Sequence, residues 1–154
     1  MPSEGGLDRN SAKRPIKIEY SSGPSWYQGQ TVKRVKYTFE ENAFEYEETI
    51  EYGLHELMES RLDSYEKKTA FTFKSRAFQE VLEGVFPPLK SAVEHETNHI
   101  CDGPVEEITI RYDDGTEENV VRCYWVLPRR NISRLLQGKI PEKAFRTIFS
   151  AGDD

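Results

Sequence analysis

The sequence lacks long apolar runs and has few cysteines. Of its 154 residues, 36% are hydrophobic and 31% are charged, and its apolar runs are only a few residues long. A transmembrane helix needs about 20 apolar residues, so we expect no membrane partner. The N-terminus has no apolar segment behind a basic start, and we therefore expect no signal peptide. Cys101 and Cys123 are too few for a disulfide framework, so we expect two thiols and a cytoplasmic location.

The sequence also lacks an excess of positive charge. Its net charge of −6 argues against general affinity for nucleic acid. The charge is uneven, because residues 38–66 carry ten acids and one base, whereas residues 119–149 carry seven bases and one acid. Such blocks can steer a charged partner, or they can be solvated faces of neighbouring elements that neutralise each other.

The length and composition predict one folded domain, over residues 15–149. Residues 1–14 contain Gly, Ser, Asn and charged residues without periodicity, which indicates a flexible leader, and we expect a flexible tail over residues 150–154. Eight tyrosines and eight phenylalanines argue against a disordered chain.

Alternating apolar and polar residues predict an α+β fold with a mainly antiparallel sheet of about five strands. The expected strands, two hairpins and an N-terminal strand, cover residues 15–20, 32–39, 44–52, 106–112 and 117–126. If Asp114 and Gly115 form the centre of the second turn, Ile108 faces Val121, and Val121 and Trp125 lie on the core face. Helical periodicity predicts helices packed on one face of the sheet: residues 54–65, one helix on each side of Pro87-Pro88, and two short C-terminal helices.

One short motif points to chemistry. His95-Glu96-x-x-His99 matches the H-E-x-x-H pattern of zincin peptidases, in which two histidines on one helix face bind zinc and the glutamate acts as base. The sequence offers no third ligand at a zincin spacing, since no histidine follows His99. We therefore favour no catalytic residue and no metal, and expect both histidines to lie at the end of a helix. A zinc-dependent hydrolase that uses His95, Glu96 and His99 is the alternative.

Two other arrangements would combine these histidines with the cysteines. His95, His99, Cys101 and Cys123 have the right types for a structural zinc site, but only one residue separates His99 from Cys101. A nucleophilic pair of Cys101 and His99 lacks a third group to orient it.

The favoured function is binding without catalytic chemistry, with another protein as the partner. Trp26 and Tyr27 lie between glycines in a loop, which suits a contact surface, although the same aromatics could also fold back onto the sheet. The acidic block, residues 38–66, would complement a basic partner, as in an inhibitor or an immunity protein. The basic residues of 119–149 are expected to form a solvated helix face.

Overall fold

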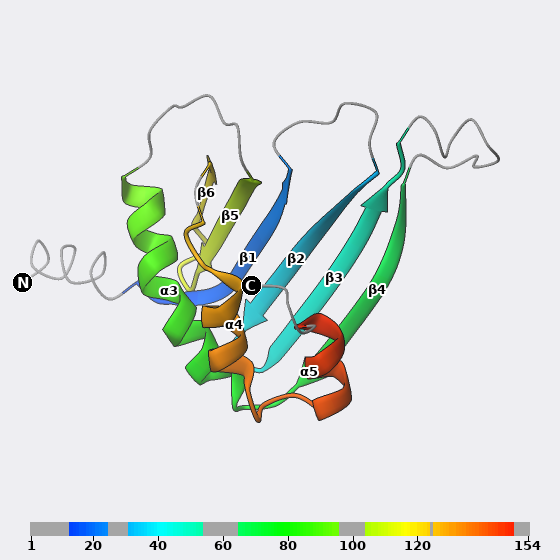
Figure 1. The fold of residues 1–154 in the computed structure, drawn as a ribbon. Helices are drawn as coiled ribbons and strands as arrows, with labels where there is room; N and C mark the ends of the chain where they lie inside the picture. Colours follow the sequence, from blue (N-terminus) through cyan, green and yellow to red (C-terminus); the bar gives the residue numbers. More distant parts are fainter. Residues whose placement is uncertain (1–12, 25–30, 54–64, 96–103, 124, 150–154) are drawn as a thin grey trace, which may run out of the picture.

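A computed structural model describes residues 13–24, 31–53, 65–95, 104–123 and 125–149, without the side chains of residues 24 and 65–68. These residues form one antiparallel sheet of six strands and three helices (Figure 1). The elements are β1 (Pro15–Pro24), β2 (Val32–Glu40), β3 (Ala43–Glu51), β4 (Tyr65–Lys74), α3 (Phe78–Glu94), β5 (Pro104–Tyr112), β6 (Glu117–Arg122), α4 (Arg129–Leu136) and α5 (Glu142–Ile148). The strand order is β4-β3-β2-β1-β5-β6, and every neighbouring pair is antiparallel. The predicted α+β class is confirmed, with six strands instead of about five.

The additional strand is β4, at one edge of the sheet. The sequence predicted a helix over residues 54–65. Tyr65 instead begins β4, and residues 54–64 lie outside the described residues. Phe73 pairs with Phe44 and Phe71 with Tyr46 on the neighbouring strand β3. The alternation of Phe71 and Phe73 was the sequence signal for this strand, and the helical spacing before it concealed that signal.

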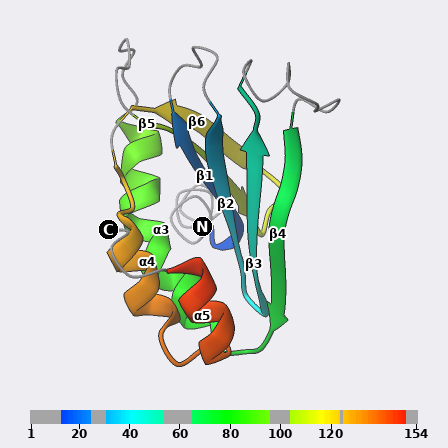
Figure 2. The same cartoon turned by 45° about the vertical axis from the view of Figure 1, so that its right-hand side comes forward.

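One face of the sheet forms the core. Its rows of cross-strand neighbours are apolar or aromatic, for example Phe44, Phe39, Ile18 and Ile110 across β3, β2, β1 and β5. All four side chains are buried, in a cluster that also includes residues of α3, α4 and α5. In Figures 1 and 2, these three helices lie on the same side of the sheet.

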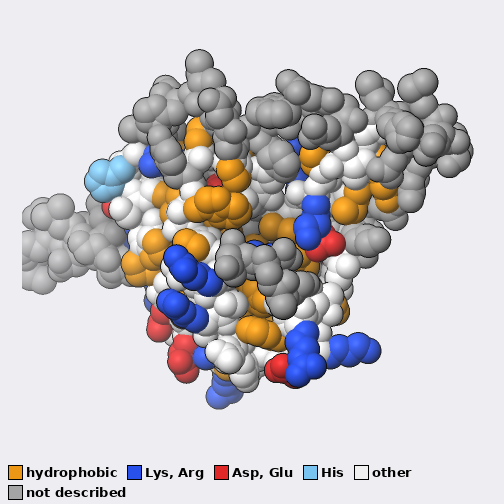
Figure 3. Space-filling view, in the orientation of Figure 1, with side chains coloured by type: hydrophobic (Ala, Val, Ile, Leu, Met, Phe, Trp, Pro, Cys, Tyr) orange, Lys and Arg blue, Asp and Glu red, His pale blue; other side chains and the backbone are white. Residues whose placement is uncertain are grey.

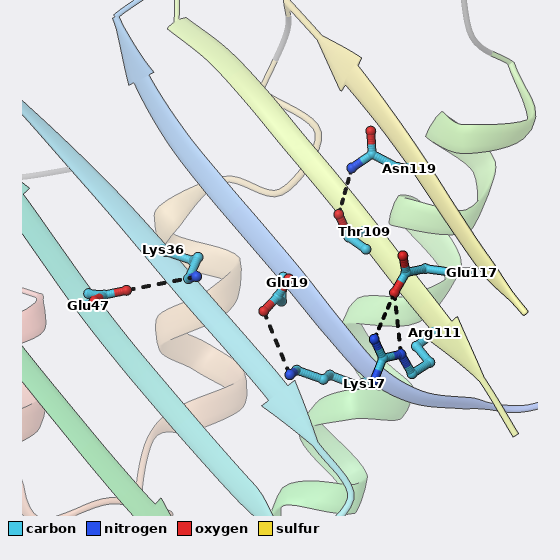
Figure 4. A network of polar contacts seen from close by, with 8 residues as sticks. All are labelled: Lys17, Glu19, Lys36, Glu47, Thr109, Arg111, Glu117 and Asn119. Carbon is cyan, nitrogen blue, oxygen red and sulfur yellow. Dashed lines mark hydrogen bonds and ion pairs between the residues drawn. The ribbon is translucent and has the colours of Figure 1, made fainter. Parts of the chain in front are cut away.

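The opposite face is polar, and its side chains contact each other across neighbouring strands (Figure 4). Lys36 on β2 lies 3.8 Å from Glu47 on β3, and Arg111 on β5 lies 3.1 Å from Glu117 on β6. Figure 4 also shows the contacts of Lys17 with Glu19 and of Asn119 with Thr109. Charges of opposite sign alternate here, which is typical of the solvent face of an antiparallel sheet.

A single helix replaces the two that Pro87-Pro88 was expected to separate. Helix α3 runs through both prolines. Its buried stripe is continuous on both sides of them and comprises Phe78, Val81, Leu82, Val85, Leu89 and Ala92. Both prolines are exposed. The backbone carbonyls that lose their helical donors therefore lie toward solvent, where water can satisfy them, and packing of the stripe outweighs the local cost.

The second hairpin differs from its predicted register by one residue. Ile108 faces Val120 instead of Val121, and Arg111 faces Glu117. The turn is longer than expected, because the amide of Tyr112 donates to the carbonyl of Thr116 at 2.9 Å and Gly115 adopts a φ of 88°. This is the three-residue loop with a left-handed glycine, whereas the sequence predicted a two-residue turn. A one-residue shift exchanges the faces of all side chains in the strand, so Val120 is buried and Val121 is exposed.

The two C-terminal helices occur where they were predicted. Gly138 adopts a φ of 80° just after α4, the left-handed conformation that commonly ends a helix. The next helix, α5, begins after Pro141, whose fixed φ suits a helix start. Among the described residues, no helix is long and apolar enough to cross a membrane.

Cys123, just beyond β6, is disulfide-bonded, so the expectation that both cysteines remain thiols is wrong. The chain has one other cysteine, Cys101, which lies outside the described residues. Disulfides persist in oxidising compartments and are rare in the cytosol. Cysteine usage therefore no longer supports a cytoplasmic location.

Candidate binding site

Most of the residues predicted to form a site lie outside the described part of the chain. This applies to Trp26, Tyr27, Glu96 and His99. His95 is described and is the C-cap of α3, which ends at Glu94. Its ring Nδ1 lies 2.8 Å from the carbonyl oxygen of Ser91. A carbonyl can only accept, so Nδ1 donates in this contact.

The described residues do not assemble a metal site. No group of three or more His, Cys, Asp or Glu side chains converges among them. The candidate set of His95, His99, Cys101 and Cys123 requires Cys123 as a thiolate ligand, but Cys123 is disulfide-bonded. That structural zinc site is therefore excluded by the state of Cys123.

Several acids of the block 38–66 are paired with bases of the same chain. Glu47 lies 3.8 Å from Lys36, and Glu51 lies 3.2 Å from Arg34. Two more pairs join Glu48 to Lys33 at 3.7 Å and Glu41 to Arg14. Each pair at this surface contributes little to stability. In the described part of the block, these four acids therefore already lie beside a base of the same chain.

The most prominent described surface feature is Trp125, in the connection between β6 and α4. Trp125 and Val121 are the large hydrophobic side chains exposed among the described residues, each with 53% of its surface accessible. Trp125 lines a pocket of about 280 Å³ together with Pro128, Arg129 and Arg130. The predicted register placed Trp125 on the core face, so the sequence did not identify it as a site residue. The available signal was its position, just after the hairpin and before Pro128-Arg129-Arg130.

A buried carboxylate holds the backbone next to Trp125. Glu106 on β5 is 0% exposed, and its Oε1 and Oε2 accept the amide of Val126 at 2.8 Å and 3.0 Å. The hydroxyl of Tyr20 also donates to Glu106, and it lies 3.0 Å from the carbonyl oxygen of Leu127. The connection from β6 to α4 is thus tied to the centre of the sheet by polar contacts as well as by the buried side chain of Leu127.

Burial changes the acidity of this carboxylate. Loss of solvent raises the pKa of Glu106 above its ordinary value, and the hydrogen bonds from Tyr20 and Val126 partly offset that rise. Burial also raises the pKa of Tyr20, and the neighbouring Glu106 raises it further. The Tyr20 hydroxyl therefore remains a donor at neutral pH.

Tyr20 belongs to a row of three buried tyrosines across β1, β2 and β3. The ring centroids of Tyr20 and Tyr37 are 6.3 Å apart, and those of Tyr37 and Tyr46 are 5.3 Å apart. The Tyr46 hydroxyl donates to Glu48 at 2.8 Å. The Tyr37 hydroxyl is buried and makes no hydrogen bond within the described part of the chain. Burial raises the pKa of Tyr37, and the guanidinium of Arg129 beside it counteracts that rise.

The two arginines at the start of α4 have different environments. Arg129 donates to the carbonyl of Ile148, and its guanidinium lies 5.7 Å from the ring centroid of Phe149. Arg130 is exposed, and its side chain contacts no acceptor among the described residues. In the space-filling view, Lys and Arg side chains gather over the region of α4 and α5 (Figure 3). The site therefore combines an exposed indole, a fixed guanidinium and an accessible one.

This arrangement can bind a ligand. The aromatic ring of Trp125 and the side chains of Arg129 and Arg130 line one pocket, and Glu106 holds the backbone next to Trp125 in place. No protein-family model, curated protein or solved structure matches this chain.

Proposed function

We propose that the protein works by binding another protein, and that it does so through the surface formed by Trp125, Pro128, Arg129 and Arg130, here called the Trp125 surface. One observation carries the proposal: a half-exposed tryptophan lies in a segment that a fully buried carboxylate holds in place. Trp and Arg are the residues most enriched among those that dominate binding energy at protein interfaces.

The buried network supports this proposal through the entropy of binding. A loop that must be ordered on association reduces the affinity, whereas a segment already held in one conformation does not. Glu106 and Tyr20 bond the backbone on the C-terminal side of Trp125, at Val126 and Leu127. The indole is therefore presented on a backbone that is fixed before the partner arrives.

The charge of the Trp125 surface changes the kind of partner that we propose. The acidic block was predicted to meet a basic partner, but several of its acids already have bases beside them. Among the described residues that line it, the Trp125 surface has two arginines and no acid, so it suits an acidic partner. An inhibitor of another protein remains one form of this function, and Trp26 and Tyr27 remain predicted contacts.

The test is affinity capture with three forms of the full chain: wild type, Trp125→Ala and Val121→Ala. Val121 is a matched control, because it has the same exposed fraction but lies on the polar face of the sheet, opposite Glu107. We expect one partner to be retained by wild type and Val121→Ala and lost with Trp125→Ala. Equal retention by all three forms would refute the Trp125 surface as the interface.

A further inference from the structure

We propose that the pocket at the start of α4 is an anion subsite, which receives a carboxylate or phosphate group carried on an apolar side chain of the partner. This inference rests on the proposed function and specifies the chemistry of the partner. Among the described residues, four line the pocket, and none of these four is acidic: Trp125, Pro128, Arg129 and Arg130.

The accessible cation of the pocket is Arg130. Its side chain is exposed and, within the described residues, is bonded to no carboxylate or carbonyl. Most bases of the described sheet lie beside acids instead, as Lys36 lies beside Glu47 and Arg111 beside Glu117. A guanidinium presents a planar fork of donors that matches the two oxygens of a carboxylate or a phosphate. Arg130 can therefore accept an anion without first breaking an ion pair with those residues.

The second cation is held in position. Arg129 contacts the carbonyl of Ile148 and the ring of Phe149, both at the end of α5. On the sheet side, it lies beside the hydroxyl of Tyr37, which is 2% exposed and has no hydrogen-bond partner among the described residues. A cation held by contacts with the end of α5 and with β2 adds positive potential to the pocket with little loss of side-chain entropy on binding.

The backbone contributes donors at the same place. Pro128 is the N-cap of α4 and provides no side-chain cap. The amide of Arg130, in the first turn, has no hydrogen-bond acceptor among the described residues. Free amides and the helix dipole both favour an anion at this end of a helix. The two guanidiniums that line the pocket are independent of this backbone effect and act in the same direction.

Trp125 determines the kind of chemical group to which the bound anion is attached. A bare inorganic ion would leave the exposed indole in water, whereas an apolar or aromatic group attached to the anion can pack on it. The pocket volume of about 280 Å³ is near the lower limit for a small-molecule site, which suits one side chain of a partner rather than a large cofactor. A phosphorylated tyrosine and an acidic residue next to an aromatic one share this chemistry.

The test is a titration of the full chain followed by two-dimensional amide NMR. The probes are phenyl phosphate, phenylacetate and the neutral benzyl alcohol. Comparing the first two distinguishes binding of a phosphate from binding of a carboxylate, and benzyl alcohol shows the effect of the aromatic ring without a charge. We expect at least one anionic probe to shift the Arg130 amide and the Trp125 indole resonances, and benzyl alcohol to shift them much less.

Arg130→Gln and Arg134→Gln form the matched pair of variants. Both side chains are exposed on α4, but only Arg130 lines the pocket. Loss of a charge-assisted hydrogen bond should weaken binding of the anionic probe about tenfold in Arg130→Gln. Arg134→Gln should change binding by no more than about twofold, because a screened charge outside the pocket contributes little.

The anion subsite is overturned if neither anionic probe shifts these resonances, or if both variants weaken binding equally, as a diffuse basic face would. It is also overturned if a single-stranded oligonucleotide binds here and the two phenyl probes do not. These failures differ from failure of the proposed function. A partner whose capture depends on Trp125 but not on Arg130 would leave the Trp125 surface valid and remove the anion subsite alone.

Discussion

Replacing Glu106 with alanine should lower the free energy of unfolding by about 3 kcal/mol. The substitution removes the acceptor of the Val126 amide, which Glu106 bonds at 2.8 Å and 3.0 Å, and one partner of the Tyr20 hydroxyl. Each buried donor left without an acceptor costs about 1–3 kcal/mol. Tyr20 retains the carbonyl of Leu127 at 3.0 Å, so its share of the loss is the smaller one.

Glu106→Gln is the control for this substitution. Its amide oxygen can still accept from Val126, so we expect a loss of no more than about 1 kcal/mol. Urea denaturation followed by circular dichroism measures all three forms. A loss below about 1 kcal/mol in Glu106→Ala, or equal losses in the two variants, would refute the inference that Glu106 holds this segment.

The same residue predicts a pH dependence. Burial raises the pKa of Glu106 in the folded state above its ordinary value of 4.5, so the folded state binds its proton more tightly than the unfolded state does. The contribution of Glu106 to stability is therefore highest below pH 4.5 and decreases as the pH rises from there through the folded-state pKa. The stability of wild type relative to Glu106→Gln should fall over this window and be constant above it. A difference that rises with pH would show that the pKa is lowered instead.

Three further perturbations test the fold. In urea denaturation, Val120→Ala should lower the free energy of unfolding by about 2 kcal/mol and Val121→Ala by less than about 0.5 kcal/mol, because only Val120 faces the core. The reverse order would indicate the register of the two-residue turn. A thiol assay in denaturant should find no free cysteine before reduction and two free cysteines after it. Cys123→Ser removes the disulfide, and it should lower the free energy of unfolding by roughly 3 kcal/mol. Two reactive thiols in the purified protein would contradict this. Gly138→Ala should lower the melting temperature, since a side chain at a φ of 80° costs about 1 kcal/mol.

The strands that were predicted correctly are those whose alternation is strong. Tyr37 and Phe39 on β2, and Phe44 and Tyr46 on β3, alternate with polar residues and pair as expected across a short turn. Helix α3 was divided in two because proline is a strong local signal, whereas the continuous stripe that overrides it is a property of tertiary packing.

The site was not predicted, because both the register and the end of one strand were predicted wrongly: β6 ends at Arg122, whereas the predicted strand continued to residue 126. Asp114-Gly115 allows a two-residue or a three-residue turn, and the wrong choice placed Trp125 in the core. The role of Glu106 could not be foreseen from sequence, because its partners Tyr20 and Val126 are 86 and 20 residues away along the chain. The pattern showed an ordinary acid on a strand.

Photo-crosslinking in cells that produce the protein tests the central proposal most directly. A photoreactive residue would replace Arg134, one turn after Arg130 on α4, and in a second protein it would replace Val121 on the polar face of the sheet. We predict that position 134 captures one protein partner, that position 121 does not, and that Trp125→Ala abolishes the capture at position 134. Capture at position 121 but not at position 134, or capture at position 134 that persists in Trp125→Ala, would contradict binding through the Trp125 surface.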